Sequence, residues 1–434
     1  MRTIDLRGQQ LSSADMLAAV PRAAQARAEA LEAATRIVDE VRERGEAALR
    51  EQAERFDGVS GHAVRVPESH IVEALAALTA DVRVALEEAI RRVRIASAAQ
   101  VPPPQTTDIG EGARITQRWQ RVHRVGVYIP GGKAVYPSSV IMNVVPAQVA
   151  GVEQIALASP PQADQNGRIH PTILAAAGLL GVTEVYAMGG AGAIGAFAHG
   201  VSAIGLDPVD VVSGPGNNYV ASAKRAVAGV VGTDSEAGAT EILVVADASA
   251  DPRLIAADLV SQAEHDEQAS AVLVTDAAQL AALVAVEVER LAGATRHSER
   301  VAAALSGPQS AIVLVDDRSM ATAFSNAYAP EHLELHLEDA RDAASAFTSA
   351  GAVFVGAQTP VSLGDYMAGS NHVLPTGGQA RYAPGLGAYT FLRPQQVIEY
   401  DHAALAKVRE GVVALANAEA LPAHGEAIEA RFTA

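Results

Sequence analysis

The spacing of hydrophobic residues changes along the chain, from a helical period in the first quarter to alternating strand and helix segments afterwards. Apolar residues recurring at i, i+3 and i+4 predict amphipathic helices. These predicted helices span residues 28–44, 46–56 and 81–98. Gly45 separates the first two, and the Pro102-Pro103-Pro104 run ends the region because proline lacks the amide that a helix interior needs. Residues 10–100 are therefore expected to be largely helical.

From about residue 123, short apolar runs rich in β-branched residues alternate with Ala-rich segments long enough for helices. The first set of predicted strands spans residues 123–129, 154–159, 184–188 and 209–213. The second set spans residues 241–246, 271–275, 311–315 and 352–355. Nearly continuous apolar strands are typical of parallel sheets covered by helices on both faces. The sequence therefore predicts an α/β protein with two doubly wound, Rossmann-like domains with parallel sheets, preceded by a helical N-terminal region.

This alternation stops after Gly378. Residues 402–417 and 421–432 again have helical spacing and predict a small helical C-terminal tail. A segment of this length cannot bury enough apolar surface to fold alone, so we expect the tail to dock on another surface.

Composition narrows the class of protein. The 434 residues are 49% hydrophobic and 19% charged, as in globular proteins of several domains. A formal net charge of -17 without a Lys/Arg run disfavours a nucleic-acid partner. The long uncharged stretches, residues 135–152 and 185–206, are rich in small residues and predict buried α/β segments, not membrane spans. We see no signal-peptide pattern, and the absence of cysteine fits a reducing cytoplasm without proving it.

Residues 261–266 (SQAEHD) carry the most informative pattern for chemistry. Gln262 and His265 lie three residues apart at the end of a predicted helix, so both side chains share one helix face. An imidazole and an amide oxygen that converge can bind one metal ion, and without cysteine any such site uses nitrogen and oxygen ligands. A hydrogen-bonded pair without a metal is the alternative.

Glu331-His332 is the strongest candidate acid/base pair, because a carboxylate and an imidazole can both be tuned to titrate near neutrality. Adjacent side chains point apart in a strand, so both reach one substrate only if the backbone turns, which Pro330 favours. A solvent-exposed pair is the alternative. Asp365 lies between Gly364 and Gly369, in a predicted loop that fits close approach to another group, with a plain surface loop as the alternative. His424, in the tail, becomes a ligand candidate only if the tail docks on a cleft, with a surface residue as the alternative.

Glycine-rich turns follow several predicted strands. Residues 190–195 (GAGAIG) match the G-x-G-x-x-G dinucleotide fingerprint between a strand and a helix, but no acidic residue ends the next strand as that fingerprint requires. Residues 214–217 (GPGN) and 130–132 (PGG) hold equivalent positions. Three such turns in one domain favour a nucleotide-sized cleft, although each alone could be a plain tight turn.

Taken together, these segments resemble the histidinol dehydrogenases. The matching segments are residues 126–132 (GVYIPGG), 136–139 (YPSS), 214–217 (GPGN), 223–225 (AKR), 231–234 (VGTD), 261–265 (SQAEH), 329–332 (APEH) and 364–378 (GDYMAGSNHVLPTGG). They occur in the family's order, and the resemblance runs from about residue 25 to the C-terminus.

The resemblance implies a homodimer with shared active sites. It implies an N-terminal arm (1–24), a Rossmann-like domain with a helical N-terminal part and the metal and acid/base site (25–125 and 240–380), a second Rossmann-like domain on the NAD side (126–239), and a tail that reaches the partner subunit (381–434).

The resemblance also implies roles for individual residues. One zinc ion per subunit would be bound by Gln262, His265 and Asp365, with His424 donated by the partner. Glu331 and His332 match the acid/base pair, and Tyr128, Asn217 and Gly192 fall at NAD-contact positions. At Gly192 the family carries Gln, so that side-chain contact is missing here. Substrate contacts fall on Thr240, Gln262, His265, His332, Asp365, His372, Glu419 and His424.

The implied activity is oxidation of L-histidinol, via bound L-histidinaldehyde, to L-histidine with two NAD. In that reaction His332 takes the alcohol proton and Glu331 activates water. Two alternatives remain at this point. One is a metallohydrolase with Glu331 as base, which the glycine-rich turns disfavour. The other is a metal-binding paralogue without turnover, which the change at Gly192 motivates and the intact Glu331 and His332 disfavour.

Overall fold

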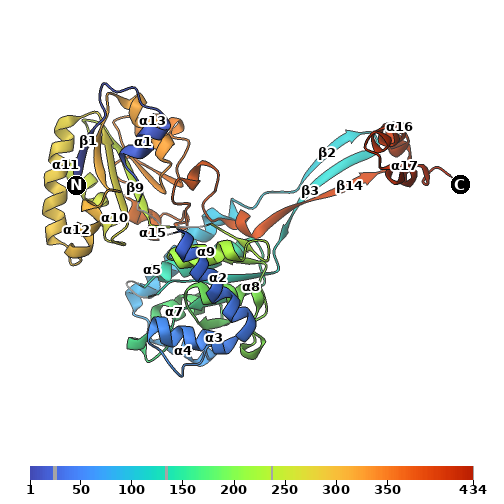
Figure 1. Ribbon diagram of the computed structural model, residues 1–434, viewed down its shortest axis with the longest axis horizontal. Coiled ribbons are helices and arrows are strands. Elements are labelled where there is room, and N and C mark those ends of the chain that lie inside the picture. Colours follow the sequence, from blue (N-terminus) through green and yellow to red (C-terminus); the bar gives the residue numbers. More distant parts are fainter. Residues whose placement is uncertain (23–26, 132–134, 236–237, 434) are drawn as a thin grey trace. The chain divides into compact units, whose positions relative to one another are not determined.

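The computed structural model describes residues 1–22, 27–131, 135–235 and 238–433 (Figure 1). It separates into two units. Unit 1 comprises residues 1–100 and 122–391, and unit 2 comprises residues 101–121 and 392–434. Unit 1 contains two parallel sheets, so the predicted α/β class with two doubly wound domains is confirmed. Gly132 of the predicted 130–132 turn lies outside the described residues.

The first sheet has six parallel strands in the order β1-β11-β10-β9-β12-β13. These are β1 (Arg2–Asp5), β11 (Ala311–Leu314), β10 (Ser270–Thr275), β9 (Glu241–Ala246), β12 (His332–His336) and β13 (Ala352–Val355). Along β9, Ile242 and Val244 pack beneath α10 (Pro252–Ala263), α11 (Ala278–Ala294) and α12 (Ser298–Ser306). The alternate residues Leu243 and Val245 pack against α1 (Ser13–Ala19) and α13 (Arg318–Tyr328) on the other face (Figure 1).

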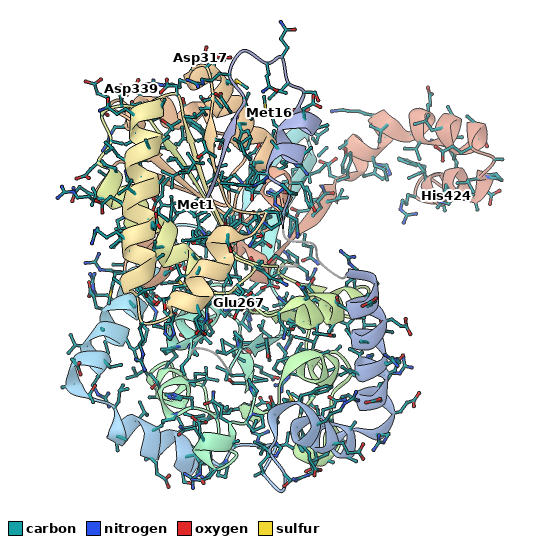
Figure 2. The ribbon with its side chains drawn as sticks, turned by 60° about the vertical axis from the view of Figure 1, so that its left-hand side comes forward. Met1, Met16, Glu267, Asp317, Asp339 and His424 are labelled. Carbon is teal, nitrogen blue, oxygen red and sulfur yellow. The ribbon has the colours of Figure 1, made fainter. Side chains whose placement is uncertain are left out.

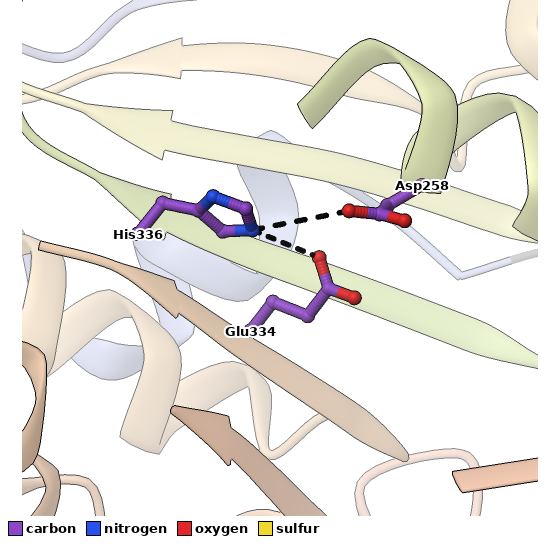
Figure 3. A group of neighbouring side chains, drawn as sticks. All are labelled: Asp258, Glu334 and His336. Carbon is purple, nitrogen blue, oxygen red and sulfur yellow. Dashed lines mark hydrogen bonds and ion pairs between the residues drawn. The ribbon is translucent and has the colours of Figure 1, made fainter. Parts of the chain in front are cut away.

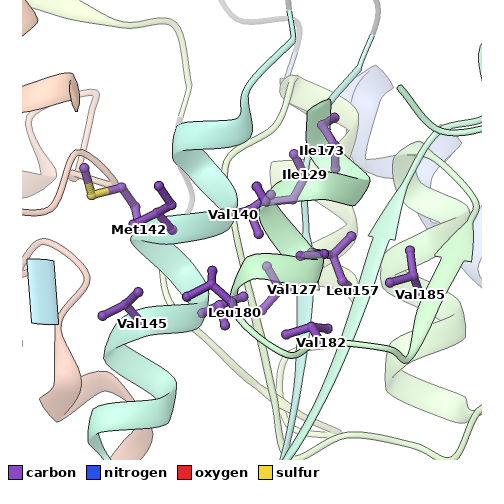
Figure 4. Close-up of a cluster of buried hydrophobic side chains, with 14 of the residues drawn as sticks. Val127, Ile129, Val140, Met142, Val145, Leu157, Ile173, Leu180, Val182 and Val185 are labelled. Carbon is purple, nitrogen blue, oxygen red and sulfur yellow. The ribbon is translucent and has the colours of Figure 1, made fainter. Parts of the chain in front are cut away.

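The second sheet has five parallel strands in the order β6-β5-β4-β7-β8. These are β6 (Val185–Ala187), β5 (Gln154–Ser159), β4 (Arg124–Tyr128), β7 (Val211–Ser213) and β8 (Gly232–Thr233). Its helices are α6 (Pro137–Val149), α7 (Pro171–Leu179), α8 (Gly190–His199) and α9 (Asn218–Ala226). Figure 4 shows the core on one face, where Val127 and Leu157 of the strands meet Val140 of α6 and Ile173 of α7.

The N-terminal helices belong with the five-stranded sheet, whereas we expected residues 25–125 to accompany the sheet of residues 240–380. These helices are α2 (Arg27–Arg44), α3 (Glu46–Gln52), α4 (Glu68–Ala77) and α5 (Ala80–Ala98). Helix α2 packs on α8 and α9, α4 on α7, and α5 on α6. Their apolar stripes complete the two cores of that sheet. Helical spacing predicts an apolar face but not which sheet it covers, so the sequence could not settle this point.

The N-terminal arm is also more than an extension. Its strand β1 pairs in parallel with β11, from Arg2 opposite Ala311 to Asp5 opposite Leu314. The arm therefore forms one edge of the six-stranded sheet that carries the predicted acid/base pair.

Unit 2 contains an antiparallel sheet that we did not predict. Strand β3 (Ala113–Arg121) lies between β2 (Gln105–Gly110) and β14 (Leu392–Tyr400). The predicted tail helices follow as α16 (His402–Ala418) and α17 (Pro422–Glu429). Of the predicted tail at 381–434, residues 381–391 belong to unit 1. The part of the tail in unit 2 begins with the long strand β14. Among the described residues, no helix has the length and apolar character needed to cross a membrane.

Candidate functional site

The strand order of the five-stranded sheet reverses between β4 and β7, because β5 and β6 lie on one side of β4 and β7 and β8 lie on the other. In doubly wound folds, ligands bind at the carboxyl ends of the strands that flank such a reversal. Tyr128 ends β4, and its buried hydroxyl accepts a hydrogen bond from the Gly190 amide, 3.1 Å away, at the start of α8. Burial raises the pKa of Tyr128 to about 12, so this residue remains a neutral phenol.

The turn after β7 approaches β4 very closely. Gly214 has a φ of +117°, and a Cβ at this position would lie 1.9 Å from the Tyr128 carbonyl oxygen. Only glycine fits there. The turn is fixed by a buried ion pair, because Lys224 donates to the Gly214 carbonyl at 2.6 Å and Asp234 accepts from the Gly214 amide at 2.8 Å.

Asn217 and Gly192 are two predicted cofactor positions. Local packing limits which of their atoms can contact a ligand. The Asn217 side-chain oxygen caps α9 by accepting from the amides of Tyr219 and Val220, which leaves its amide nitrogen for a ligand. Gly192 is buried within α8, and a Cβ there would lie 2.0 Å from the Gln52 Oε1 atom. A cofactor contact at Gly192 would therefore use the backbone alone.

The predicted acid/base pair lies at the amino end of β12. Ala329 ends α13 with a φ of 50°, and after Pro330 the chain enters β12 at His332. Glu331 and His332 are both buried, and the Glu331 Oε2 atom lies 3.5 Å from the His332 Nδ1 atom. The backbone turn on which the pairing depends is present, so the two side chains converge despite their adjacency.

The two side chains have different hydrogen-bond partners, which lie at the start of β9. The Glu331 Oε2 atom accepts hydrogen bonds from the Thr240 hydroxyl at 2.6 Å and the Glu241 amide at 2.9 Å. The His332 Nδ1 atom lies 3.0 Å from the Glu241 carbonyl oxygen, which can only accept. The His332 Nδ1 therefore carries the proton, and Nε2 is the basic nitrogen. Burial raises the pKa of Glu331 to about 7, although His332 and Thr240 oppose that shift.

Thr240 extends this network to the predicted metal ligands. The Gln262 amide nitrogen, in the last turn of α10, donates to the Thr240 hydroxyl at 2.6 Å. The Gln262 carbonyl oxygen is thereby left as the atom able to coordinate a metal ion. His265 follows just after the helix, and its amide donates to the Gln262 backbone carbonyl at 3.3 Å.

The segment containing Asp365 connects the two halves of unit 1. Asp365 lies on α15 (Val361–Tyr366), and its carbonyl oxygen lies 3.0 Å from the His372 Nδ1 atom. The His372 Nε2 atom lies 3.1 Å from the Ser139 hydroxyl, at the start of α6. Surrounding protein lowers the pKa values of His265 and His372, while the Asp365 charge opposes both shifts. The charge of Asp365 therefore acts on both histidines.

The remaining predicted residues lie in unit 2. Glu419 ends α16 and its side chain is exposed. His424 lies on α17 and its side chain is also exposed (Figure 2). Ser139 and Glu241 also belong to the network, although no sequence pattern predicts them. Ser139 falls inside a matched segment without an assigned role, and Glu241 acts at His332 through its backbone carbonyl, which no side-chain pattern reveals.

Comparison with known proteins identifies the family of the chain. A family model described as histidinol dehydrogenase matches residues 20–432. The chain is similar to the histidinol dehydrogenase of Leifsonia xyli subsp. xyli, with 63% identity over 100% of this chain and 99% of that protein. It is 54% identical to that of Corynebacterium glutamicum, covering 100% and 98% of the two chains. The crystal structure of histidinol dehydrogenase from Elizabethkingia anophelis superimposes with a TM-score of 0.93 at 31% identity, covering 100% of this chain and 98% of that one.

Proposed function

The chain belongs to the histidinol dehydrogenase family, and on that premise we propose that it oxidises L-histidinol, through bound L-histidinaldehyde, to L-histidine with two NAD as acceptors. The observation that carries the proposal is the network joining Glu331, Thr240 and Gln262, with His332 anchored beside it on Glu241. It gathers a base, a carboxyl group and an amide ligand around one point. Family membership favours this dehydrogenase over a metallohydrolase.

The turns at the carboxyl end of the five-stranded sheet support the proposed NAD site. Helix α8 starts at Gly190 beside the Tyr128 hydroxyl, and Gly214 permits a close backbone approach beside Tyr128. Asn217 offers its amide nitrogen at the start of α9. Bound NAD would supply the hydride acceptor for each oxidation.

The donor set suits the proposed zinc ion. Gln262 offers a carbonyl oxygen, His265 an imidazole nitrogen and Asp365 a carboxylate, all of which are ligands that zinc accepts. When bound, zinc would orient L-histidinol through the imidazole and amine of the substrate. The lowered pKa of His265 keeps its imidazole neutral near pH 7, as a metal ligand must be.

His332 would take the proton of the alcohol. Its Nδ1–H is committed to the Glu241 carbonyl, so the basic Nε2 is fixed in orientation and tautomer. Burial of His332 excludes water that would otherwise compete for this proton.

Glu331 would serve the second oxidation by deprotonating the water that hydrates the aldehyde. A carboxylate with a pKa raised to about 7 is a far better base than one with the ordinary pKa of 4.5, and it is still ionised in a substantial fraction at neutral pH.

We further propose that Glu419 and His424 complete the site of a second copy, so that the enzyme is a homodimer with shared active sites. Unit 2 supports this, because its elements leave large apolar side chains exposed, among them Ile109, Ile398, Leu415 and Leu421. Such a surface fits burial against a partner.

The experiment that tests the proposed function is removal and return of the metal. Dialysis against a chelator should abolish NADH formation from L-histidinol, and zinc should restore it in the native protein but not in a His265→Ala variant. Full activity of a rigorously metal-free protein would contradict the proposed role of zinc.

A further inference from the structure

A buried cluster of ionisable side chains lies outside the residues proposed for the reaction. Asp258 comes from α10, and Glu334 and His336 come from β12 (Figure 3). The His336 Nε2 atom lies 3.3 Å from the Glu334 Oε2 atom and 3.9 Å from the Asp258 Oδ2 atom. The Glu334 side chain is 1% exposed, so its partners must replace water completely.

The second oxygen of Glu334 reaches a third element. Its Oε1 atom accepts a hydrogen bond of 2.8 Å from the backbone amide of Val361, the first residue of α15. This amide has no partner within the helix, since the first turn of a helix leaves its N–H groups free. One carboxylate therefore joins α10, β12 and α15.

Each of these elements carries a residue of the proposed site at a short, fixed interval. Gln262 lies one helical turn after Asp258 on α10, and Asp365 lies one turn after Val361 on α15. His332 lies two residues before Glu334, so both side chains project from the same face of β12. A shift of α15 against β12 would displace Asp365 from Gln262 and His332.

The charges within the cluster favour a firm connection. Burial and the neighbouring charge of Glu334 raise the pKa of Asp258 to about 8, so Asp258 is mostly protonated at neutral pH. A protonated carboxyl group donates to Glu334 instead of repelling it. Glu334 has a partner on each carboxylate oxygen, which makes one arrangement of its elements strongly preferred, whereas the His336 Nδ1 atom has no hydrogen-bond partner among the described residues.

We propose that Glu334 is a positioning residue for the reaction, which holds the start of α15 against β12 and α10 and thereby fixes Asp365 relative to Gln262 and His332. This inference rests on the proposed function, in which Asp365 and Gln262 bind zinc and His332 takes the alcohol proton. Glu334 acts through the Val361 amide and does not touch the substrate.

The test compares Val361→Pro with Val361→Ala in the full chain. Proline removes the amide that Glu334 accepts, and it is tolerated at the first position of a helix. Pro360 already has a ψ of 156°, which suits a following proline. Alanine removes most of the same buried side chain but keeps the amide, so the difference between the variants reports the hydrogen bond. Glu334→Leu and Glu334→Gln test the other partner, since Gln keeps an oxygen acceptor.

Zinc affinity, measured by competition with a chromogenic chelator, should fall about 10–100-fold in Val361→Pro relative to Val361→Ala, as for other partners that orient metal ligands. The kcat/KM for L-histidinol should fall with it, while KM for NAD stays unchanged. Glu334→Leu should behave like Val361→Pro, and Glu334→Gln should restore most of the affinity. Ile312→Ala in β11 serves as the control for a general loss of stability in the same sheet.

Equal zinc affinity in folded Val361→Pro and Val361→Ala proteins would overturn the proposal. So would loss of a second equivalent of metal from a His336→Ala variant, which would make the cluster itself a metal site. A native protein that binds zinc but does not oxidise L-histidinol would instead refute the proposed function, and the affinity comparison would still decide the role of Glu334.

Discussion

Glu331 and His332 are neighbours in the chain, yet the residues that hold them give them different chemistry. A backbone carbonyl holds the His332 Nδ1 proton, whereas Glu331 is buried and receives hydrogen bonds from Thr240 and the Glu241 amide. These different environments support the proposal that the two residues act as bases in separate steps.

The first prediction separates those tasks. Glu331→Gln keeps the size and the hydrogen-bond acceptor of the side chain but removes the base, so oxidation of L-histidinaldehyde should slow by about 10²–10⁴-fold. Oxidation of L-histidinol to the aldehyde should slow far less. Single-turnover NADH formation from each substrate measures the two effects. Equal losses in both would show that Glu331 has a binding or structural role.

The second prediction concerns pH. Glu331 acts only when deprotonated, and its pKa is raised to about 7 by burial. The rate of aldehyde oxidation should therefore rise with pH through about 7 and then level, and it should fall as pH drops below 7. In Glu331→Gln this inflection should be missing. An inflection that survives the substitution would belong to another group.

The third prediction concerns Gly192. A Cβ at this position would lie 2.0 Å from the Gln52 Oε1 atom and 3.5 Å from the Leu49 side chain. The Gln52 side chain is buried and its amide donates to the Ile37 carbonyl and the Glu40 carboxylate, so moving it aside breaks these contacts. We expect the overpacking cost of about 1–3 kcal/mol to outweigh the gain of roughly 1 kcal/mol from replacing glycine by alanine in a helix. Gly192→Ala should thus lower the free energy of unfolding in urea, and adding Gln52→Ala should relieve most of the loss. A Gly192→Ala protein more stable than the native one would refute the contact.

Among the secondary-structure elements, the apolar strands are the ones that the sequence predicts best. Strands β5, β9 and β13 match their predicted bounds, because each contains a nearly continuous apolar run, as is typical of parallel strands. Strand β12 was not predicted, since His332, Glu334 and His336 interrupt its apolar pattern for the site and the cluster beneath it. Strands β2, β3 and β14 were not predicted because none carries an apolar run: β2 is exposed throughout, and β3 and β14 are only partly covered.

Only parts of the candidate site can be predicted from the sequence. Spacing pairs Gln262 with His265, and adjacency pairs Glu331 with His332, because those relations are local. That Thr240 joins Glu331 to Gln262, or that Ser139 reaches His372, follows from strand order and helix packing, which no local pattern encodes. The resemblance to a family supplied Thr240 and His372, whereas Ser139 was predicted neither by the resemblance nor by any local pattern.

The fourth prediction concerns the turn between β7 and α9. Lys224→Met leaves Asp234 buried without its cation, and breaking a buried pair in this way costs about 3–5 kcal/mol. Because the pair also holds Gly214, KM for NAD should rise while zinc affinity is unchanged. The double variant with Asp234→Asn should recover part of the stability. Unchanged urea unfolding of Lys224→Met would show that the pair is not buried in solution.

At the scale of the whole molecule, the fifth prediction concerns sharing of residues between copies. His265→Ala and His424→Ala should each be inactive, but a heterodimer of the two contains one intact site if His424 serves the partner. Statistical mixing should therefore restore roughly a quarter of native activity. If verified heterodimers remain inactive, His424 does not complete the partner's site.

The proposed reaction requires that one bound substrate passes through two oxidations at the site of Glu331 and His332. The most direct measurement is the amount of NADH formed per molecule of L-histidinol by the zinc-loaded protein with NAD in excess. We predict two NADH per L-histidinol with L-histidine as the product, and almost none from His332→Ala. A single NADH with release of free aldehyde, or no NADH from the fully zinc-loaded native protein, would contradict the account.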